Sequence, residues 1–304
     1  GGHFVPPTPL NGALLLLLVM VLVSQYATFD MAFSYSKIAN LIYGVAVYFA
    51  VTAFIGRQRA RLWWALAALL AIGWGMALVG LLGTQWKETV PLVAQVTNRL
   101  PTAALPLPGL VGGALSPNQL AGVLPWVLFP ALLLAGAAWG WGREWRLAIR
   151  PFPVQLSRLF VTISAVVFGG MLLLTQSRSG YLGLAVGLGL AVLVVLWAWS
   201  KRWALIILGL GLLGLGGGLA AVGPETAAEM IFPQVGVEAG DFSGGVASLS
   251  GRVEIWSRAL YGLQDFPFTG MGMNNFRRVV HILYPLFLIP PDTDIAHAHN
   301  HLLQ

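Results

Sequence analysis

Residues 159–199 read LFVTISAVVFGGMLLLTQSRSGYLGLAVGLGLAVLVVLWAW, and this stretch decides the fold. Its two apolar runs, 159–175 and 181–199, are each long enough to cross much of a bilayer, for which about 20 apolar residues are needed. Backbone in hydrocarbon must satisfy its own hydrogen bonds, and neither run alternates as a barrel strand does. The stretch therefore predicts two transmembrane helices joined by a short polar connection with Arg178 in its middle.

The composition extends this prediction to the whole chain. Of 304 residues, 57% are hydrophobic and 9% charged, with a mean hydropathy of +0.78, whereas a soluble domain is about one quarter charged. We predict an all-α polytopic membrane protein, with seven spans at about 10–27, 38–56, 62–83, 119–141, 159–176, 180–199 and 203–222. The net charge of +6 then bears on topology and anionic lipid rather than on nucleic acid, and the lack of cysteine excludes disulfide and thiolate chemistry.

Basic residues orient the predicted bundle. They cluster between spans two and three, four and five, and six and seven, at Arg57, Arg59, Arg61, Arg143, Arg146, Arg150, Arg158, Lys201 and Arg202. The positive-inside rule makes that side cytoplasmic. We therefore expect residues 1–222 to form a transmembrane bundle with an external segment at 84–118. Residues 223–304 would form a large external loop, cut before further spans.

Three local patterns lead to further expectations. QWKETVPLVAQVTNRL (85–100) predicts a short amphipathic helix on the outer interface, anchored by Trp86. In SPNQLAG (116–122), Ser116 suits a helix cap and Pro117 the first turn, while Asn118 is either structural or a binding residue. The glycines of 209–218 would let helices pack closely.

Arg178 has two interpretations. It could extend to lipid phosphate at the interface, as arginines at span ends do. Alternatively, together with Ser177 and Ser179, it could receive phosphate oxygens, because a guanidinium offers five donors in a planar fork. An ionisable residue at membrane depth that faces the bundle usually marks a site. We therefore favour a phosphate or diphosphate ligand.

The segment SGRVEIWSRALYGL (250–263) predicts a helix. Val253, Trp256, Leu260 and Leu263 share one stripe, and Arg252 and Arg258 lie off it, with Arg258 expected to be a surface residue. The following GMGMNN is a weak match to a phosphate loop and lacks the preceding strand, so we predict no nucleotide site.

The sequence PPDTDIAHAHNHLLQ (290–304) is dense in polar groups and leaves three interpretations open. A divalent metal could bind Asp292 or Asp294 with two of His297, His299 and His301. The segment could instead be an ordinary polar loop, or one histidine could act as a general base near neutral pH.

Together, SPNQLAG, TQSRSGYLGL, SGRVEIWSRAL with FPFTGMGMNNF, and AHAHNHLL resemble the O-antigen ligase and O-antigen polymerase family of bacterial envelope enzymes. The resemblance covers roughly residues 35–304. It implies a multi-helix bundle with a large external loop in the bacterial inner membrane, and an active site on the periplasmic face. The implied donor is an undecaprenyl-diphosphate-linked glycan, and the implied acceptor is a glycan or lipid-linked sugar.

The resemblance also implies roles for single residues. Arg178 and Arg252 would engage the donor diphosphate, and His299, followed by Asn300, would be the base that activates the acceptor hydroxyl. We expect Ser177, Ser179, Asn118, His297 and Asn300 to contribute to substrate binding. The implied chemistry is inverting and needs neither metal nor cofactor, although the DTD sequence and His301 have no counterpart in the family pattern.

A transporter or flippase of lipid-linked glycans is the alternative function. Such a protein would be expected to carry charges along a path between the leaflets, whereas the middles of the predicted spans are almost free of ionisable residues. The sequence favours transfer over transport. It does not distinguish a ligase from a polymerase, since these differ in the acceptor.

Overall fold

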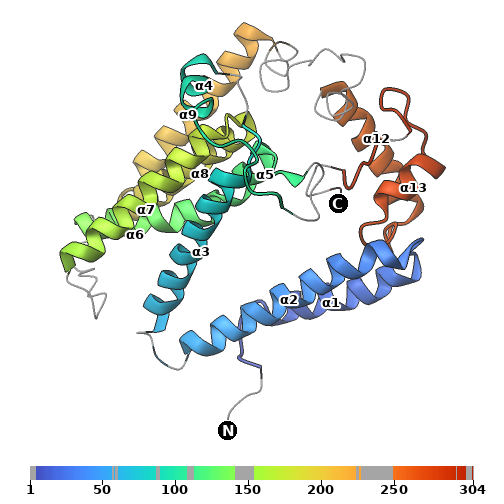
Figure 1. The fold of residues 1–304 in the computed structure, drawn as a ribbon, viewed down its shortest axis with the longest axis horizontal. Helices are drawn as coiled ribbons and strands as arrows, with labels where there is room; N and C mark the ends of the chain where they lie inside the picture. Colours follow the sequence, from blue (N-terminus) through green and yellow to red (C-terminus); the bar gives the residue numbers. More distant parts are fainter. Residues whose placement is uncertain are drawn as a thin grey trace. The chain divides into compact units, whose positions relative to one another are not determined.

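The structure is a computed structural model that describes residues 5–56, 58, 61–86, 90–107, 113–140, 154–223, 226, 249–291, 293–298 and 303. This part of the chain forms eleven helices and no strand, which confirms the all-helical class (Figure 1). The helices are α1 (Asn11–Tyr26), α2 (Met31–Gly56), α3 (Arg61–Gly83), α4 (Pro91–Thr97), α5 (Pro117–Val123), α6 (Pro125–Trp139), α7 (Val154–Leu174), α8 (Arg178–Trp199), α9 (Lys201–Val222), α12 (Leu249–Asp265) and α13 (Phe276–Leu283).

Five of the described helices, α2, α3, α7, α8 and α9, are long and apolar enough to cross a membrane. The helices α5 and α6 pass the same test as a pair, but they are bent by 44° at Leu124, as in a broken span or a re-entrant segment. The 16-residue α1 is shorter than a usual span. All seven predicted runs are thus helical, and membrane-spanning length is confirmed for five of them.

The described chain divides into two compact units, with the division inside α9. The first unit combines residues 1–57 with 216–304, and the second comprises residues 58–215.

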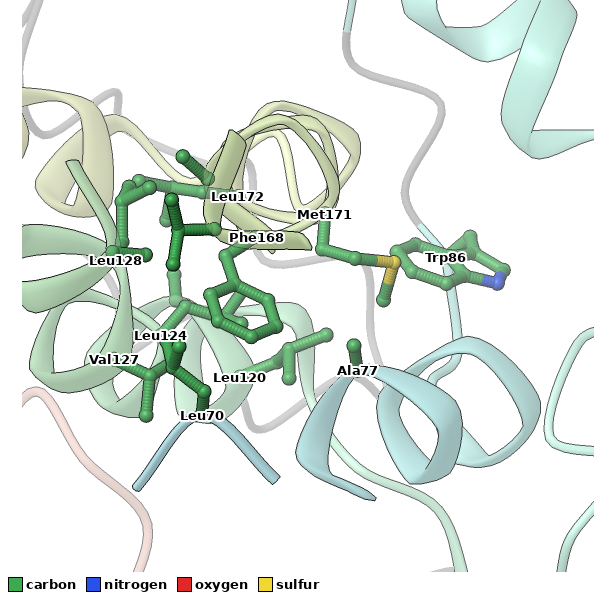
Figure 2. Packing of buried hydrophobic residues seen from close by; sticks show 14 residues of the cluster. Leu70, Ala77, Trp86, Leu120, Leu124, Val127, Leu128, Phe168, Met171 and Leu172 are labelled. Atoms are coloured by element: carbon green, nitrogen blue, oxygen red, sulfur yellow. The ribbon is translucent and has the colours of Figure 1, made fainter. Parts of the chain in front are cut away.

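The core of the second unit lies between α3, α5, α6 and α7. Phe168 of α7 is fully buried and lies among side chains of the other helices in Figure 2. Gly73 of α3 makes room for its ring, because a Cβ there would lie 2.5 Å from Phe168 Cζ. The neighbouring Trp74 packs edge-on against the same ring and donates from Nε1 to Ser164 Oγ at 3.0 Å. Glycine therefore allows α3 and α7 to approach closely, as is common between membrane helices.

Trp86 belongs to this core and is not an interfacial anchor. It precedes α4, is 9% exposed, belongs to the same buried cluster as Met171 (Figure 2), and donates from Nε1 to the carbonyl of Pro101 at 3.1 Å. The prediction that Trp86 anchors a helix at the membrane interface is wrong, because the indole has both an apolar environment and a hydrogen-bond acceptor inside the unit. The predicted helix is real but short, since α4 contains seven residues.

The glycine-rich run of α9 does not pack as predicted within its unit. A Cβ added at Gly209, Gly211 or Gly214 would meet no described atom within 4 Å. These glycines therefore allow no close helix contact in the described structure.

In the first unit, α12 packs against α13 and the segment that follows it. The buried face of α12 carries Ile255 and Ala259, which are 0% and 3% exposed, whereas Val253 and Leu260 are about half exposed. The apolar stripe identified in the sequence is therefore not the face that packs. Partners far along the chain, Ile289 and Ile295, decide which face is buried.

Asn275 joins this part of the unit to the start of α2. It is fully buried, its Oδ1 accepts the N–H of Asp30 at 2.8 Å, and its Nδ2 donates to Ser34 Oγ at 2.9 Å. Gly272 has φ +83°, and a Cβ there would lie 2.7 Å from Thr28 Cα. The backbone of the GMGMNN sequence is therefore in close contact with the connection between α1 and α2.

Candidate functional site

Arg178 is the first residue of α8 in the second unit, and its side chain is exposed. Ser177 caps the helix: it is 1% exposed, and its Oγ accepts the N–H of Gly180 at 3.4 Å and lies 3.2 Å from Ser179 Oγ. The N-terminus of a helix presents backbone N–H groups and the positive end of the helix dipole. The guanidinium, the hydroxyl of Ser179 and the helix terminus together form a cationic, donor-rich end of α8.

Gln176 holds the turn before α8 in place. It is buried and has φ +50°, a left-handed conformation that is uncommon for a residue with a side chain. Its Oε1 accepts the N–H of Val90 at 2.6 Å, and its Nε2 lies 3.5 Å from Thr97 Oγ1. These contacts attach the α7–α8 turn to α4, so the position of Arg178 is set by residues about 80 positions earlier in the chain.

The SPNQLAG sequence packs against the same end of α8. Ser116 and Gln119 form a capping box at the start of α5, and Pro117 occupies the first turn, which confirms the predicted cap. A Cβ at Gly180 would lie 2.9 Å from the Cβ of Ala121, so α5 and α8 are in close contact there. Asn118 is exposed on the first turn of α5. Asn118 therefore lies at the start of α5, and Ser177, Arg178 and Ser179 at the start of α8, and these two helices contact each other.

Arg252 lies in the first turn of α12 in the first unit. Its side chain is partly buried, and burial lowers the pKa of the guanidinium. One helical turn later, Trp256 donates from Nε1 to the carbonyl of Ala298 at 2.9 Å. Ala298 and Ile295 are buried against Ile255 of α12. The helix that carries Arg252 therefore also holds the residue directly before His299.

Glu254 and Arg258 have structural contacts on α12. Both carboxylate oxygens of Glu254 accept backbone N–H groups, from Phe287 at 2.6 Å and Leu288 at 2.9 Å. Arg258 donates from Nε to the carbonyl of Pro285 at 2.9 Å and lies 3.8 Å from Glu254, with its side chain 16% exposed. Arg258 is not a surface residue as predicted, because it joins α12 to the segment after α13.

A second polar contact joins the ends of α12 and α13. Tyr284 Oη donates to Asp265 Oδ2 at 2.5 Å. Burial, and then the neighbouring carboxylate, raise the pKa of Tyr284 to about 12. The phenol therefore stays protonated and remains a donor across the physiological range.

The first unit also contains a cavity of about 740 Å³. Helices α1 and α2, the end of α12 and the segment 266–276 line it, mostly with apolar side chains, and His297 contributes a polar group. Lys37 of α2 lines the cavity as well. Lys37 was not among the predicted site residues, because it directly precedes the predicted span 38–56, whereas the observed helix α2 begins earlier, at Met31, and includes it.

Several residues of the histidine segment (290–304) lie outside the described residues, including the site candidates Asp292, His299, Asn300 and His301. Among the residues that are described, no three His, Cys, Asp or Glu side chains form a group suited to a metal ion. Asp294 instead pairs with Arg277, at 3.4 Å between Oδ1 and Nε. The base and metal interpretations of this segment both stay predictions.

Comparison with known protein families gives a match to the C-terminal part of the chain. The family model described as O-antigen ligase matches residues 163–304. These residues are similar to the O-antigen ligase family. The match includes the α7–α8 turn with Arg178, the helix with Arg252 and the histidine segment, and it confirms the resemblance found in the sequence. Searches of curated proteins and of solved structures found no match.

Similarity to the O-antigen ligase family suggests the coarse function. It indicates a membrane glycosyltransferase of ligase or polymerase type, which acts on a lipid-linked glycan and an acceptor. The five apolar helices of spanning length agree with a membrane protein.

Proposed function

We propose that this O-antigen ligase domain transfers a glycan from an undecaprenyl-diphosphate-linked donor to an acceptor hydroxyl. Such a donor already carries its leaving group, so the reaction needs cations for the departing diphosphate and a base for the nucleophile. The proposed mechanism uses no metal, no cofactor and no nucleotide. It inverts the anomeric centre, because the acceptor oxygen attacks opposite the leaving diphosphate.

Arg178 is the proposed ligand of the diphosphate in the second unit. An exposed guanidinium at the N-terminus of a long helix, beside the hydroxyl of Ser179, suits phosphate oxygens in charge and in hydrogen-bond donors. Lysine would keep the charge but lose the bidentate fork. We propose that Ser177, Ser179 and Asn118 support the same role.

The observation that carries the proposal is the hydrogen bond from Trp256 to the carbonyl of Ala298. It attaches the segment that leads to His299 to the helix that carries Arg252. We propose that Arg252 engages the diphosphate and that His299 takes the proton of the acceptor hydroxyl. His297 and Asn300 would orient the acceptor. A neutral histidine can accept a proton near pH 7 because its unperturbed pKa lies close to that value.

The proposed location is the bacterial inner membrane with the reaction on the periplasmic face. The three basic clusters support this sidedness through the positive-inside rule, since they would be cytoplasmic. The 11 Asp and Glu residues support it as well, because only Glu144 falls on the side of those clusters. Residues 223–304 would then be an external loop.

The test is the product formed by purified full-length protein from lipid-linked glycan and candidate acceptors. We expect transfer by the wild type and loss of most turnover in Arg178→Lys, with normal folding. Arg158→Lys is the matched control, because Arg158 lies 5.9 Å from the ring centroid of Trp139 and has no proposed catalytic role. Near-normal turnover by Arg178→Lys would favour the lipid-contact interpretation. Movement of the glycan lipid without product would favour transport.

A further inference from the structure

We propose that the first unit binds an anionic membrane lipid, with the lipid phosphate at Lys37 and Arg278 and an apolar chain in the adjoining cavity. The inference does not depend on the glycosyltransferase proposal. It is tested by lipid binding, so the two can fail separately.

Cationic side chains gather at the start of α2. The guanidinium carbons of Arg277 and Arg278 lie 5.3 Å and 5.2 Å from the ring centroid of Phe33. Lys37 follows Phe33 by four residues, and residues at this spacing lie on the same face of a helix, with their Cβ atoms about 6 Å apart. Two guanidinium groups and one ammonium group are therefore associated with one face of α2.

The nearby carboxylates do not neutralise all three cations. Asp294 pairs with Arg277, and Asp30 Oδ1 accepts the N–H of Ala32 at the start of α2. Within the described residues, no carboxylate lies within ion-pairing distance of Lys37 or Arg278. Both side chains are exposed, so their charges are available to an anion.

The cavity beside Lys37 suits a hydrocarbon chain. Its volume of about 740 Å³ falls in the usual range for ligand pockets, and its lining includes Leu17, Met20 and Leu41. Among its described lining residues, Lys37 is the only Lys, Arg, Asp or Glu. One cation at the edge of an apolar cavity matches an amphiphile with an anionic head, whereas a small soluble anion would leave the apolar lining without a partner.

The position of Lys37 along α2 places it near lipid headgroups. Met31 begins the helix, and six residues at 1.5 Å each place Lys37 about 9 Å from that end. A lysine near the end of a span extends its ammonium to the interface while its methylene groups contact apolar surface. Because α2 is a candidate span, a lipid phosphate would lie within reach of this ammonium.

The test is a titration of full-length protein in zwitterionic nanodiscs with fluorescent phosphatidylglycerol. We expect saturable binding that the double variant Lys37→Gln/Arg278→Gln weakens about tenfold or more, since each cation near a membrane surface contributes about 1 kcal/mol toward anionic lipid. The control Lys201→Gln/Arg202→Gln removes two exposed cations at the start of α9 and should leave binding unchanged. Thermal unfolding of each variant checks that folding is preserved.

A second pair of variants tests the cavity. Leu41→Trp fills part of the lining and should weaken phosphatidylglycerol binding, whereas Ile42→Trp, at a neighbouring position outside the lining, should not. Equal affinity for phosphatidylcholine, no effect of the double variant, or equal effects of the two tryptophans would each overturn the proposal. Competition by inorganic phosphate would also overturn it, because the site would then take a free anion.

Discussion

Gly180 of α8 lies directly against Ala121 of α5, so that a Cβ on Gly180 would be 2.9 Å from the Cβ of Ala121 and 3.2 Å from Leu172 Cδ1. The contact joins the TQSRSG sequence to the SPNQLAG sequence. It lies two residues from Arg178 and sets how closely the N-terminus of α8 approaches α5. A structural contact and the proposed diphosphate ligand therefore share one turn of helix.

Gly180→Ala should lower the thermal unfolding midpoint of the protein in detergent. Cβ atoms at 2.9 Å force the two helices apart, and such overpacking costs about 1–3 kcal/mol. The added variant Ala121→Gly should restore much of the lost stability, because it removes the opposing methyl group. Gly183→Ala is the control: it lies on the same helix, and its Cβ would meet no described atom within 4 Å. Equal thermal unfolding midpoints for all these variants would contradict the close contact between Gly180 and Ala121.

Asn275→Ala should destabilise the first unit strongly. The change leaves the Asp30 N–H without its acceptor and removes the donor to Ser34 Oγ, although the Met273 carbonyl keeps its bond from Ser34. An unsatisfied buried polar group costs about 1–3 kcal/mol. Asn275→Asp should also destabilise, since it loses the donor and buries a charge. Asn40→Ala, at an exposed position of α2, should melt like the wild type. The measurement is the unfolding midpoint followed by intrinsic fluorescence.

Arg252→Ala should impair turnover, whereas Arg258→Ala should impair stability. If Arg252 engages diphosphate, its loss should remove most turnover while the unfolding midpoint changes little. Arg258 contacts Glu254 and the Pro285 carbonyl, so its loss should lower the midpoint but spare turnover in the folded fraction. Specific activity per folded protein, measured beside thermal unfolding, separates the two effects. Similar inactivation per folded molecule would argue against the assignment.

His299→Ala in the full-length protein should be nearly inactive yet still bind the lipid-linked donor. Removal of a general base costs about 10²–10⁴ in rate. His301→Ala should be milder, and His297→Ala intermediate. Activity should persist in EDTA, and Asp294→Ala should remain active because Asp294 pairs with Arg277. Loss of activity in chelator, restored by a divalent ion and shared by Asp294→Ala, would instead support a metal site.

Single cysteines test the proposed sidedness directly, because the chain contains none of its own. Gly240→Cys should react with an impermeant thiol reagent added to intact cells. Trp145→Cys should react only after the membrane is made permeable. The opposite pattern would reverse the topology and remove the argument for a periplasmic reaction.

The sequence by itself determined the helical class, the approximate positions of the seven apolar runs and the cap of α5, but not the early start of α2, the break between α5 and α6, or α13. Apolar runs of about 20 residues must become helices in lipid, since no other single segment satisfies its own backbone there. The cap of α5 could be predicted for a similarly local reason, because the side chains of Ser116 and Gln119 form hydrogen bonds with backbone N–H groups only three residues away. The family resemblance likewise depended on short motifs read along the chain.

The tertiary structure decided which side of each helix is buried and which motifs meet. On α12, apolar residues occur on two faces, and Ile289 and Ile295 select the face of Ile255 and Ala259. Trp86 is buried for a similar reason, because the helices that enclose it come from distant parts of the chain. Lys37 was recognised only because it lines a cavity that the end of α12 also lines. The periodicity of apolar residues shows which faces of a helix could pack. It does not show which face is buried, because the packing partners lie far away along the chain.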